Sequence, residues 1–253
     1  MSPLKLKLIN FFQQSLDSGI NYFLFEEAVA ERITKPKKHS TFTTEFKPIT
    51  KTKSREEIKN ENFNLLFNEM KNNQNTPQTS KTDTSIIEQF KDLNQLQTHL
   101  QTCMNCELGI TRLKLVFGSG SQSPDIVVIG EAPGEEEDES GLPFVGRAGK
   151  LLTDILASIK INRDDVYITN ICKCRPPANR KPTNNEINQC EPFLIKQLEL
   201  LKPQFILAFG LTAAEALFNK KQNLGEYRGK IWDYNGTKTF VTYHPAALLR
   251  NPN

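Results

Sequence analysis

Four short apolar runs, three of them followed by a helical pattern, constrain the fold of this 253-residue chain more than any other feature. The runs occupy residues 125–129, 166–169, 205–209 and 239–243. The helical patterns cover residues 148–160, 183–201 and 211–218. Strands that alternate with helices form a parallel sheet with helices on both faces. We therefore predict a three-layer α/β/α fold around a central, mostly parallel, four-stranded sheet.

Glycine divides the chain into two parts. Only Gly19 lies in the first hundred residues, whereas the other twelve glycines follow position 108. The tight turns of a compact α/β domain need glycine, because it adopts backbone conformations that other residues avoid. We expect the compact domain to span residues 84–253. Its first helix is predicted from an apolar stripe made by Ile86, Phe90, Leu93, Leu96 and Leu100.

Residues 1–83 are predicted to form an N-terminal extension of a different kind. Residues 4–33 carry apolar side chains at helical spacing, which favours a helical hairpin. Residues 34–83 are rich in Lys, Thr, Asn, Gln and Ser, and this composition is typical of a disordered linker.

The charge and hydropathy of the chain exclude few classes of function. The net charge of +3 permits nucleic-acid binding but does not argue for it. No run approaches the roughly 18 apolar residues that cross a membrane. The N-terminus has no continuous apolar core of the signal-peptide kind. We expect a cytoplasmic monomer, and a reducing compartment keeps thiols free of disulfides.

The five cysteines follow a pattern that favours metal binding. Cys103 and Cys106 form a C-x2-C pair, whose thiolates can face one ion. Cys174 and Cys190 flank a proline-rich loop. Four thiolates suit either zinc or an iron–sulfur cluster, so the spacing leaves the metal open. Cys172 directly follows a predicted strand, and burial fits it better than ligation.

Distinctive residues gather where the predicted strands end. Residues 131–134, Glu-Ala-Pro-Gly, follow the first strand, Asn170 follows the second and His244 the fourth. In parallel sheets, ligands bind beyond the carboxyl ends of the strands. Each residue also has a plain structural explanation, such as a turn former for Asn170 or a core aromatic ring for Phe144. The residues alone predict a pocket but leave its chemistry open.

Four segments together resemble the family 4 uracil-DNA glycosylases, the iron–sulfur branch of the uracil-DNA glycosylase superfamily. They are GEAPGEEED at 130–138, GLPFVGRAG at 141–149, YITNICKCRPP at 167–177 and HPAALLRNP at 244–252. The resemblance covers about residues 100–253 and does not reach the N-terminal hundred residues. It implies hydrolysis of the bond between uracil and deoxyribose in DNA, the step that initiates base excision repair.

The same resemblance implies roles for the residues at the strand ends. Phe144 would stack on the flipped-out base, and Asn170 would read the edge of uracil. His244 would stabilise the charge that develops on uracil O2. Further pocket residues would be Glu131, Ala132, Pro133 and Glu137.

The group that activates water is left open by the resemblance. A related branch with the motif GQDPYH uses an aspartate for this step, and Ala132 stands at the matching position. Glu131 and Glu137 are the candidates that remain. Glu137 is also implied to lie near C5 of the base, where it would exclude the methyl group of thymine.

The cofactor and the DNA contacts are implied by the resemblance as well. Family members carry a structural [4Fe-4S] cluster, whose ligands here would be Cys103, Cys106, Cys174 and Cys190. Leu248 and Leu249 would enter the duplex as an apolar wedge, and Arg250 would contact a phosphate. The partner implied is uracil-containing DNA.

Two alternative functions are weighed against this one. A metal-stabilised DNA-binding module without catalysis would not need the acidic motif or the pocket residues. A covalent uracil-trapping relative carries an additional histidine in a basic loop after the second strand. Residues 175–182, RPPANRKP, contain no histidine, which favours turnover.

Overall fold

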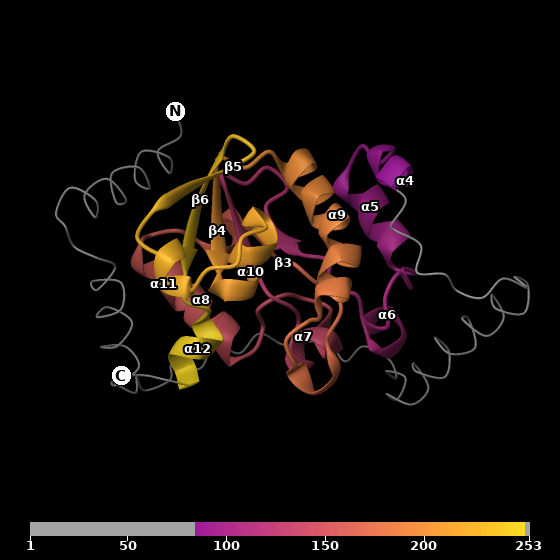
Figure 1. Ribbon diagram of the computed structural model, residues 1–253, viewed down its shortest axis with the longest axis horizontal. Helices are drawn as coiled ribbons and strands as arrows, with labels where there is room; N and C mark the ends of the chain where they lie inside the picture. Colours follow the sequence, from indigo (N-terminus) through magenta and orange to yellow (C-terminus); the bar gives the residue numbers. More distant parts are fainter. Residues whose placement is uncertain (1–83, 251–253) are drawn as a thin grey trace, which may run out of the picture.

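The computed structural model of the protein describes residues 84–250 (Figure 1). The predicted helical hairpin and linker within residues 1–83 lie outside the described residues. No helix between residues 84 and 250 has both the length and the apolar character needed to cross a bilayer.

Six strands form one sheet in the order β1-β3-β2-β4-β6-β5 (Figure 1). Their bounds are β1 Ser119–Gly120, β2 Ile126–Gly130, β3 Tyr167–Asn170, β4 Phe205–Phe209, β5 Ile231–Tyr234 and β6 Thr237–Thr242. The four central strands β3, β2, β4 and β6 run parallel, as predicted. Strands β1 and β5 pair antiparallel at the two edges. The prediction of a four-stranded sheet therefore missed the two edge strands, β1 and β5.

The missed strand β5 is joined to β6 by a two-residue turn. Asn235 and Gly236 form this turn with φ values of +49° and +84°. An Asn-Gly pair with positive φ at both positions is the preferred connection of a tight hairpin. The dipeptide was therefore a usable sequence signal for β5.

The helices predicted between the strands are present. They are α8 Arg147–Ser158, α9 Asn184–Leu201 and α10 Gly210–Phe218. Thr183 caps α9: its hydroxyl accepts from the N–H of Glu186, and the Glu186 carboxylate accepts from the N–H of Thr183. The shorter helices are α4 Thr84–Glu88, α5 Leu93–Leu100, α6 Leu108–Thr111, α7 Glu135–Ser140, α11 Leu224–Tyr227 and α12 Pro245–Arg250.

Alternate side chains of the strands pack against helices on opposite faces of the sheet. Val127 and Ile129 of β2 belong to a core shared with helices α5, α9 and α10. Ile126 and Val128 belong to a second core, to which α8 contributes. Figure 1 shows α9 and α10 in front of the sheet and α8 behind it. This confirms the predicted three-layer architecture.

The first predicted helix is divided in two. Helix α4 ends at Glu88, and Asp92 caps α5 by accepting from the N–H of Gln95 at 2.9 Å. Ile86, placed on the buried stripe by the sequence, is 42% exposed, and its neighbour Ile87 is buried instead. The prediction was wrong here because the break at residues 89–92 changes the helical phase.

Candidate active site

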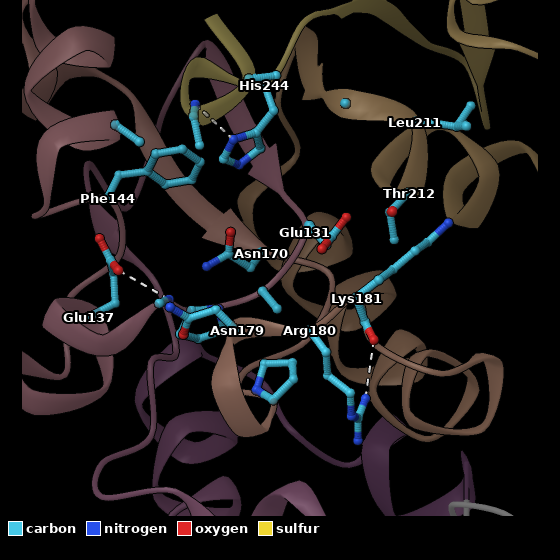
Figure 2. Close-up of a pocket in the computed structure, with 18 of the residues that line it drawn as sticks. Glu131, Glu137, Phe144, Asn170, Asn179, Arg180, Lys181, Leu211, Thr212 and His244 are labelled. Carbon is cyan, nitrogen blue, oxygen red and sulfur yellow. Dashed lines mark hydrogen bonds between the residues drawn. The ribbon is translucent and has the colours of Figure 1, made fainter. Parts of the chain in front are cut away.

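A pocket of about 520 Å³ opens at the carboxyl ends of the central strands (Figure 2). It brings together every predicted uracil-pocket residue, from strand ends and loops far apart in the sequence. The lining residues used below are Glu131, Ala132, Pro133, Glu137, Phe144, Asn170, His244 and Arg250. Topology explains the convergence, because parallel strands deliver the residues that follow them to the same edge.

Asn170 lies at the end of β3 and offers an unsatisfied polar atom to the pocket. Its side chain is almost fully buried, and its Oδ1 has no hydrogen-bond partner among the described residues. Buried polar atoms nearly always have a partner, so an orphan at the wall of a pocket indicates a ligand that supplies one. Figure 2 shows the Asn170 amide between the rings above it and the loop below.

Gly130 lets this amide and the ring of Phe144 pack closely against the end of β2. A Cβ at Gly130 would lie 2.4 Å from Oδ1 of Asn170 and 2.7 Å from Cζ of Phe144. Both contacts are closer than Cβ atoms tolerate. The absence of a side chain at Gly130 therefore allows the amide and the aromatic ring to occupy these positions, a requirement that no sequence pattern indicated.

Phe144 forms the aromatic wall of the pocket. Its side chain is buried, and its backbone has φ +52°, the left-handed region that residues with a Cβ seldom adopt. The ring lies 5.5 Å from the His244 ring and 6.2 Å from the Phe209 ring, measured between centroids. An uncommon backbone conformation at a pocket wall marks a residue whose placement is enforced by its surroundings.

Glu137 is held by the loops around it. Its Oε1 accepts from the N–H groups of Val145 and Gly146 at 2.9 and 3.0 Å, and its Oε2 accepts from the N–H of Gly134 at 3.0 Å. Both carboxylate oxygens thus have backbone donors. Glu131 differs, because its carboxylate has no hydrogen-bond partner within residues 84–250 and lines the same pocket.

His244 is a neutral imidazole with a defined proton position. Burial, the largest cause, and the positive charge of Arg250 together lower the pKa of His244 to about 4, against the opposing effect of Glu137. The Nδ1 atom accepts from the N–H of Ala246 at 3.2 Å, so the proton of the neutral ring resides on Nε2. The ring therefore presents one N–H donor.

The predicted DNA-contacting residues lie on α12, next to the pocket. Arg250 is exposed and lines the pocket mouth. Leu248 and Leu249 are only partly buried, but they pack against Leu151 and Ile155 of α8. The structure thus holds the two leucines against a helix rather than extended as a wedge.

The four predicted cluster ligands lie in one largely buried region beside α5, α6 and α9. Burial, the largest cause, and the charge on Cys190 contribute to raising the pKa of Cys106 to about 11 and that of Cys174 to about 12. Cys103 has a raised pKa for the same two reasons. Thiols that influence one another in this way are close neighbours. In the part of the chain described, no three His, Cys, Asp or Glu side chains are grouped as ligands of a single ion.

Polar donors surround these sulfur atoms. Arg112 is buried and donates from Nη1 to Sγ of Cys174 at 3.1 Å, and the N–H of Lys173 donates to Sγ of Cys190 at 3.3 Å. A hydrogen bond from the Cys172 thiol lowers the pKa of Cys190. Four thiols with buried cationic and N–H donors suit an anionic thiolate-bound cluster. Cys172 is buried, as predicted, and lies beside one of these thiols.

The loop after Cys174 contributes pocket residues that the sequence analysis did not single out. They are Pro176, Asn179, Arg180 and Lys181. Ala178 and Asn179 have φ values of +54° and +55°, two consecutive residues in the left-handed region. The signal available in the sequence was the position of this loop between two cysteines, which ties it to the cysteine region at both ends.

The chain is similar to known proteins over the same region. The family model of the uracil DNA glycosylase superfamily matches residues 117–253. A type-4 uracil-DNA glycosylase from Archaeoglobus fulgidus is 42% identical over 171 residues, covering 64% of this chain and 86% of the relative. One from Thermotoga maritima is 46% identical over 154 residues, covering 60% and 80%. A type-5 uracil-DNA glycosylase from Pyrobaculum aerophilum is 30% identical over 149 residues, covering 52% and 66%.

The pocket lies in the part of the chain that is similar to known proteins. The segments that line the pocket all fall in the region that the family model matches, including Glu131, Asn170 and His244 at the strand ends. The type-4 relatives are matched over most of their length, whereas the type-5 relative is less similar. The chain therefore belongs to the type-4 uracil-DNA glycosylases of the uracil-DNA glycosylase superfamily.

Proposed function

We propose that the protein removes uracil from DNA by hydrolysing the N-glycosidic bond, leaving an abasic site and initiating base excision repair. The observation that carries this proposal is the orphaned Oδ1 of Asn170 at the wall of the pocket, beside Phe144 and His244. Uracil must leave the base stack to reach such a pocket. A ring stacked on Phe144 would then present its edge to the amide.

Asn170 selects uracil through its paired donor and acceptor. The amide oxygen accepts from N3–H of uracil, and the amide nitrogen donates to O4. Cytosine offers the opposite pattern at these positions, so its binding would leave buried polar atoms unpaired. A mismatch of this kind supports strong discrimination, because each unpaired buried group costs about 1–3 kcal/mol.

His244 assists departure of the base. As the bond between C1′ of the sugar and N1 of uracil breaks, its electron pair moves onto the base and negative charge develops on O2. The Nε2–H of His244 donates to this oxygen, and a neutral donor suits the task because the pKa of about 4 keeps the ring uncharged at neutral pH. No proton transfer from the ring is required.

Glu131 is assigned the activation of water. Its carboxylate lines the pocket and has no competing hydrogen-bond partner between residues 84 and 250, so it is available to accept a proton from water attacking C1′. Glu137 suits this role less well, because three backbone N–H groups occupy its oxygens. Ala132 and Pro133 complete the wall beside Glu131.

DNA binds across the mouth of the pocket in this proposal. Arg250, Arg180 and Lys181 line the mouth and are exposed, which suits contacts with phosphates on either side of the flipped nucleotide. Leu248 and Leu249 would need to leave their packing on α8 to enter the duplex as a wedge. The duplex contact of these leucines therefore includes a movement of α12.

A [4Fe-4S] cluster would be held by Cys103, Cys106, Cys174 and Cys190. The fit rests on four thiols gathered in one buried region with Arg112 and the Lys173 N–H directed at their sulfur atoms. When bound, the cluster would stabilise the fold and take no part in a redox step. It would hold both ends of the segment that carries Asn179, Arg180 and Lys181 to the pocket. We place the enzyme in the cytoplasm, where thiols stay reduced, and propose that it acts as a monomer.

The test is cleavage of an oligonucleotide with a single uracil, using iron-loaded protein prepared without air and its Asn170→Asp variant. The wild type should release uracil and leave an alkali-labile site. The variant should release uracil more slowly and gain activity on cytosine, because the new oxygen can accept from the amine of cytosine. Binding of the oligonucleotide without release of uracil would contradict the proposal. A stable protein–DNA adduct would instead support the covalent trapping alternative.

A further inference from the structure

Phe144 needs an external constraint to hold the conformation in which it faces the pocket. Its φ of +52° is disfavoured for a residue with a Cβ, so the free loop would leave this state. The inference below rests on the proposed function, because it concerns the ring on which uracil is proposed to stack. The question is which residues supply the constraint.

Arg163 contacts the backbone of Phe144 from outside the pocket. It lies in a short turn after α8, and its Nη2 donates to the carbonyl oxygens of Pro143 and Phe144 at 2.7 and 3.0 Å. Its Nη1 donates to Oγ1 of Thr153 at 3.2 Å and to the carbonyl of Gly149 at 3.5 Å. The guanidinium thus binds two consecutive loop carbonyls with one nitrogen and anchors to α8 with another.

The other side of the loop is fixed by different groups. Glu137 accepts from the N–H groups of Val145 and Gly146, the two residues that follow Phe144. Gly149 allows α8 to lie against the loop, since a Cβ there would be 1.7 Å from the Phe144 carbonyl oxygen. Arg163 therefore binds the carbonyl groups of residues 143 and 144, and Glu137 binds the N–H groups of the next two residues.

We propose that Arg163 is a positioning residue for uracil excision, acting through Phe144. It does not line the pocket, so it touches neither the base nor the water. By binding the carbonyls of residues 143 and 144, it keeps the backbone in the left-handed state and the ring at the pocket wall. A planar fork with fixed donors suits two neighbouring carbonyls better than a single ammonium group does.

The test is a double-mutant cycle between Arg163 and Phe144, measured as single-turnover excision by the full-length, iron-loaded protein. Arg163→Gln should slow excision by on the order of 10²-fold, the effect expected when a contact is displaced by about 1 Å. Arg163→Lys should fall between the wild type and Arg163→Gln. In the Phe144→Ala background, Arg163→Gln should cause little further loss, because the ring that it positions is already absent.

Thr153→Val is the matched control. It removes one acceptor of Arg163 on α8 and leaves both loop carbonyl contacts available, so excision should stay near the wild-type rate. The melting temperature and the iron content are measured for every variant. If Arg163→Gln does not fold, the cycle is run with Arg163→Lys.

Each outcome of the cycle decides a separate point. An equal loss from the Arg163 substitution with and without Phe144 overturns the positioning role while leaving the stacking role of Phe144 intact. A normal rate in the folded Arg163→Gln variant overturns it too. If Phe144→Ala alone excises uracil normally, the proposed stacking fails, and the inference fails with it.

Discussion

The imidazole ring of His244 stacks on the phenyl ring of Phe144, with centroids 5.5 Å apart and planes inclined by 26°. The two rings lie 100 residues apart in the sequence and meet because the segment after β6 and the loop after α7 share one edge of the sheet. The contact also contributes to the burial that lowers the pKa of His244 to about 4. The proposed base-stacking ring and the proposed hydrogen-bond donor therefore form one wall of the pocket.

Removal of the His244 side chain should slow chemistry more than binding. His244→Ala is expected to lower the single-turnover rate by roughly 10²–10³-fold, because it deletes a donor to charge that appears only as the bond breaks. Affinity for an oligonucleotide with an uncleavable uracil analogue should change little. Weak binding combined with a normal rate for bound substrate would identify His244 as a binding residue instead.

The depressed pKa of His244 should also appear in the pH dependence of stability. The folded-state pKa of about 4 lies below the ordinary value of about 6.5, so between these limits the unfolded chain binds more protons. The free energy of unfolding should therefore fall as the pH is lowered from 7.5 to 5, by at most about 2 kcal/mol from this group.

His244→Gln isolates this contribution. Anaerobic urea unfolding of the wild type and the variant at pH 7.5 and pH 5 gives the measurement. The stability difference between the two proteins should shift in favour of the variant at pH 5, since other titrating groups are common to both. An identical pH dependence in the two proteins would show that His244 is not a buried neutral ring.

A side chain at Gly130 should displace the Asn170 amide and the Phe144 ring from their positions at the pocket wall. A Cβ at this position would contact Oδ1 of Asn170 and Cζ of Phe144, so Gly130→Ala should lower kcat/KM for uracil excision by on the order of 10²-fold. Gly225→Ala on α11 makes the same chemical change at an exposed position and should be neutral. A fully active Gly130→Ala enzyme would show that excision does not depend on the exact placement of these two side chains.

Four of the five cysteines should be ligands of the cluster, and Cys172 should lie beside them without binding iron. Protein prepared without air should be brown, absorb broadly near ~400 nm and contain about four irons per chain, as four-thiolate cluster ligation implies. Cys190→Ala should lose the iron. Cys172→Ala should retain it, because the buried Cys172 thiol contacts Cys190 without being needed as a ligand. Stoichiometric zinc in place of iron would contradict the cluster assignment.

The domain boundary predicts that residues 1–83 are dispensable for catalysis. A chain beginning at residue 84 keeps α4 and α5, whose side chains Ile87, Leu93 and Leu96 belong to the main core. It should fold and excise uracil at a rate close to that of the full-length protein in the same assay. An insoluble or inactive product would place the boundary closer to the N-terminus.

The central sheet could be predicted from the sequence because each of its strands contains a short, mostly apolar run. All five residues of β2 are buried, and a continuous buried run of this length has few alternatives between two turn signals. The positions of Asn170 and His244 could be predicted because ligands bind beyond the carboxyl ends of parallel strands, and both residues lie there. The two-residue strand β1 carried no comparable pattern, and the helix break before Asp92 shifted the buried position from Ile86 to Ile87.

Roles that depend on partners distant in the sequence could not be predicted in the same way. Glu137 is a pocket carboxylate in the sequence pattern, but its three backbone donors are visible only in the folded loop. Arg163 belongs to no pocket motif, although it donates to residues about twenty positions earlier. Periodicity identifies the face on which a residue lies but not the groups that it meets across a loop.

The close approach of α8 to the Phe144 loop should couple the residue types at positions 144 and 149 during evolution. Because a side chain at Gly149 would overlap the Phe144 carbonyl, no residue but glycine fits at 149 while the loop keeps its left-handed turn. A substitution of Gly149 alone would displace the ring of Phe144. If the loop at residue 144 adopted another conformation, position 149 would no longer require glycine. Among descendants of a common ancestor, the two positions should therefore be retained together or exchanged together.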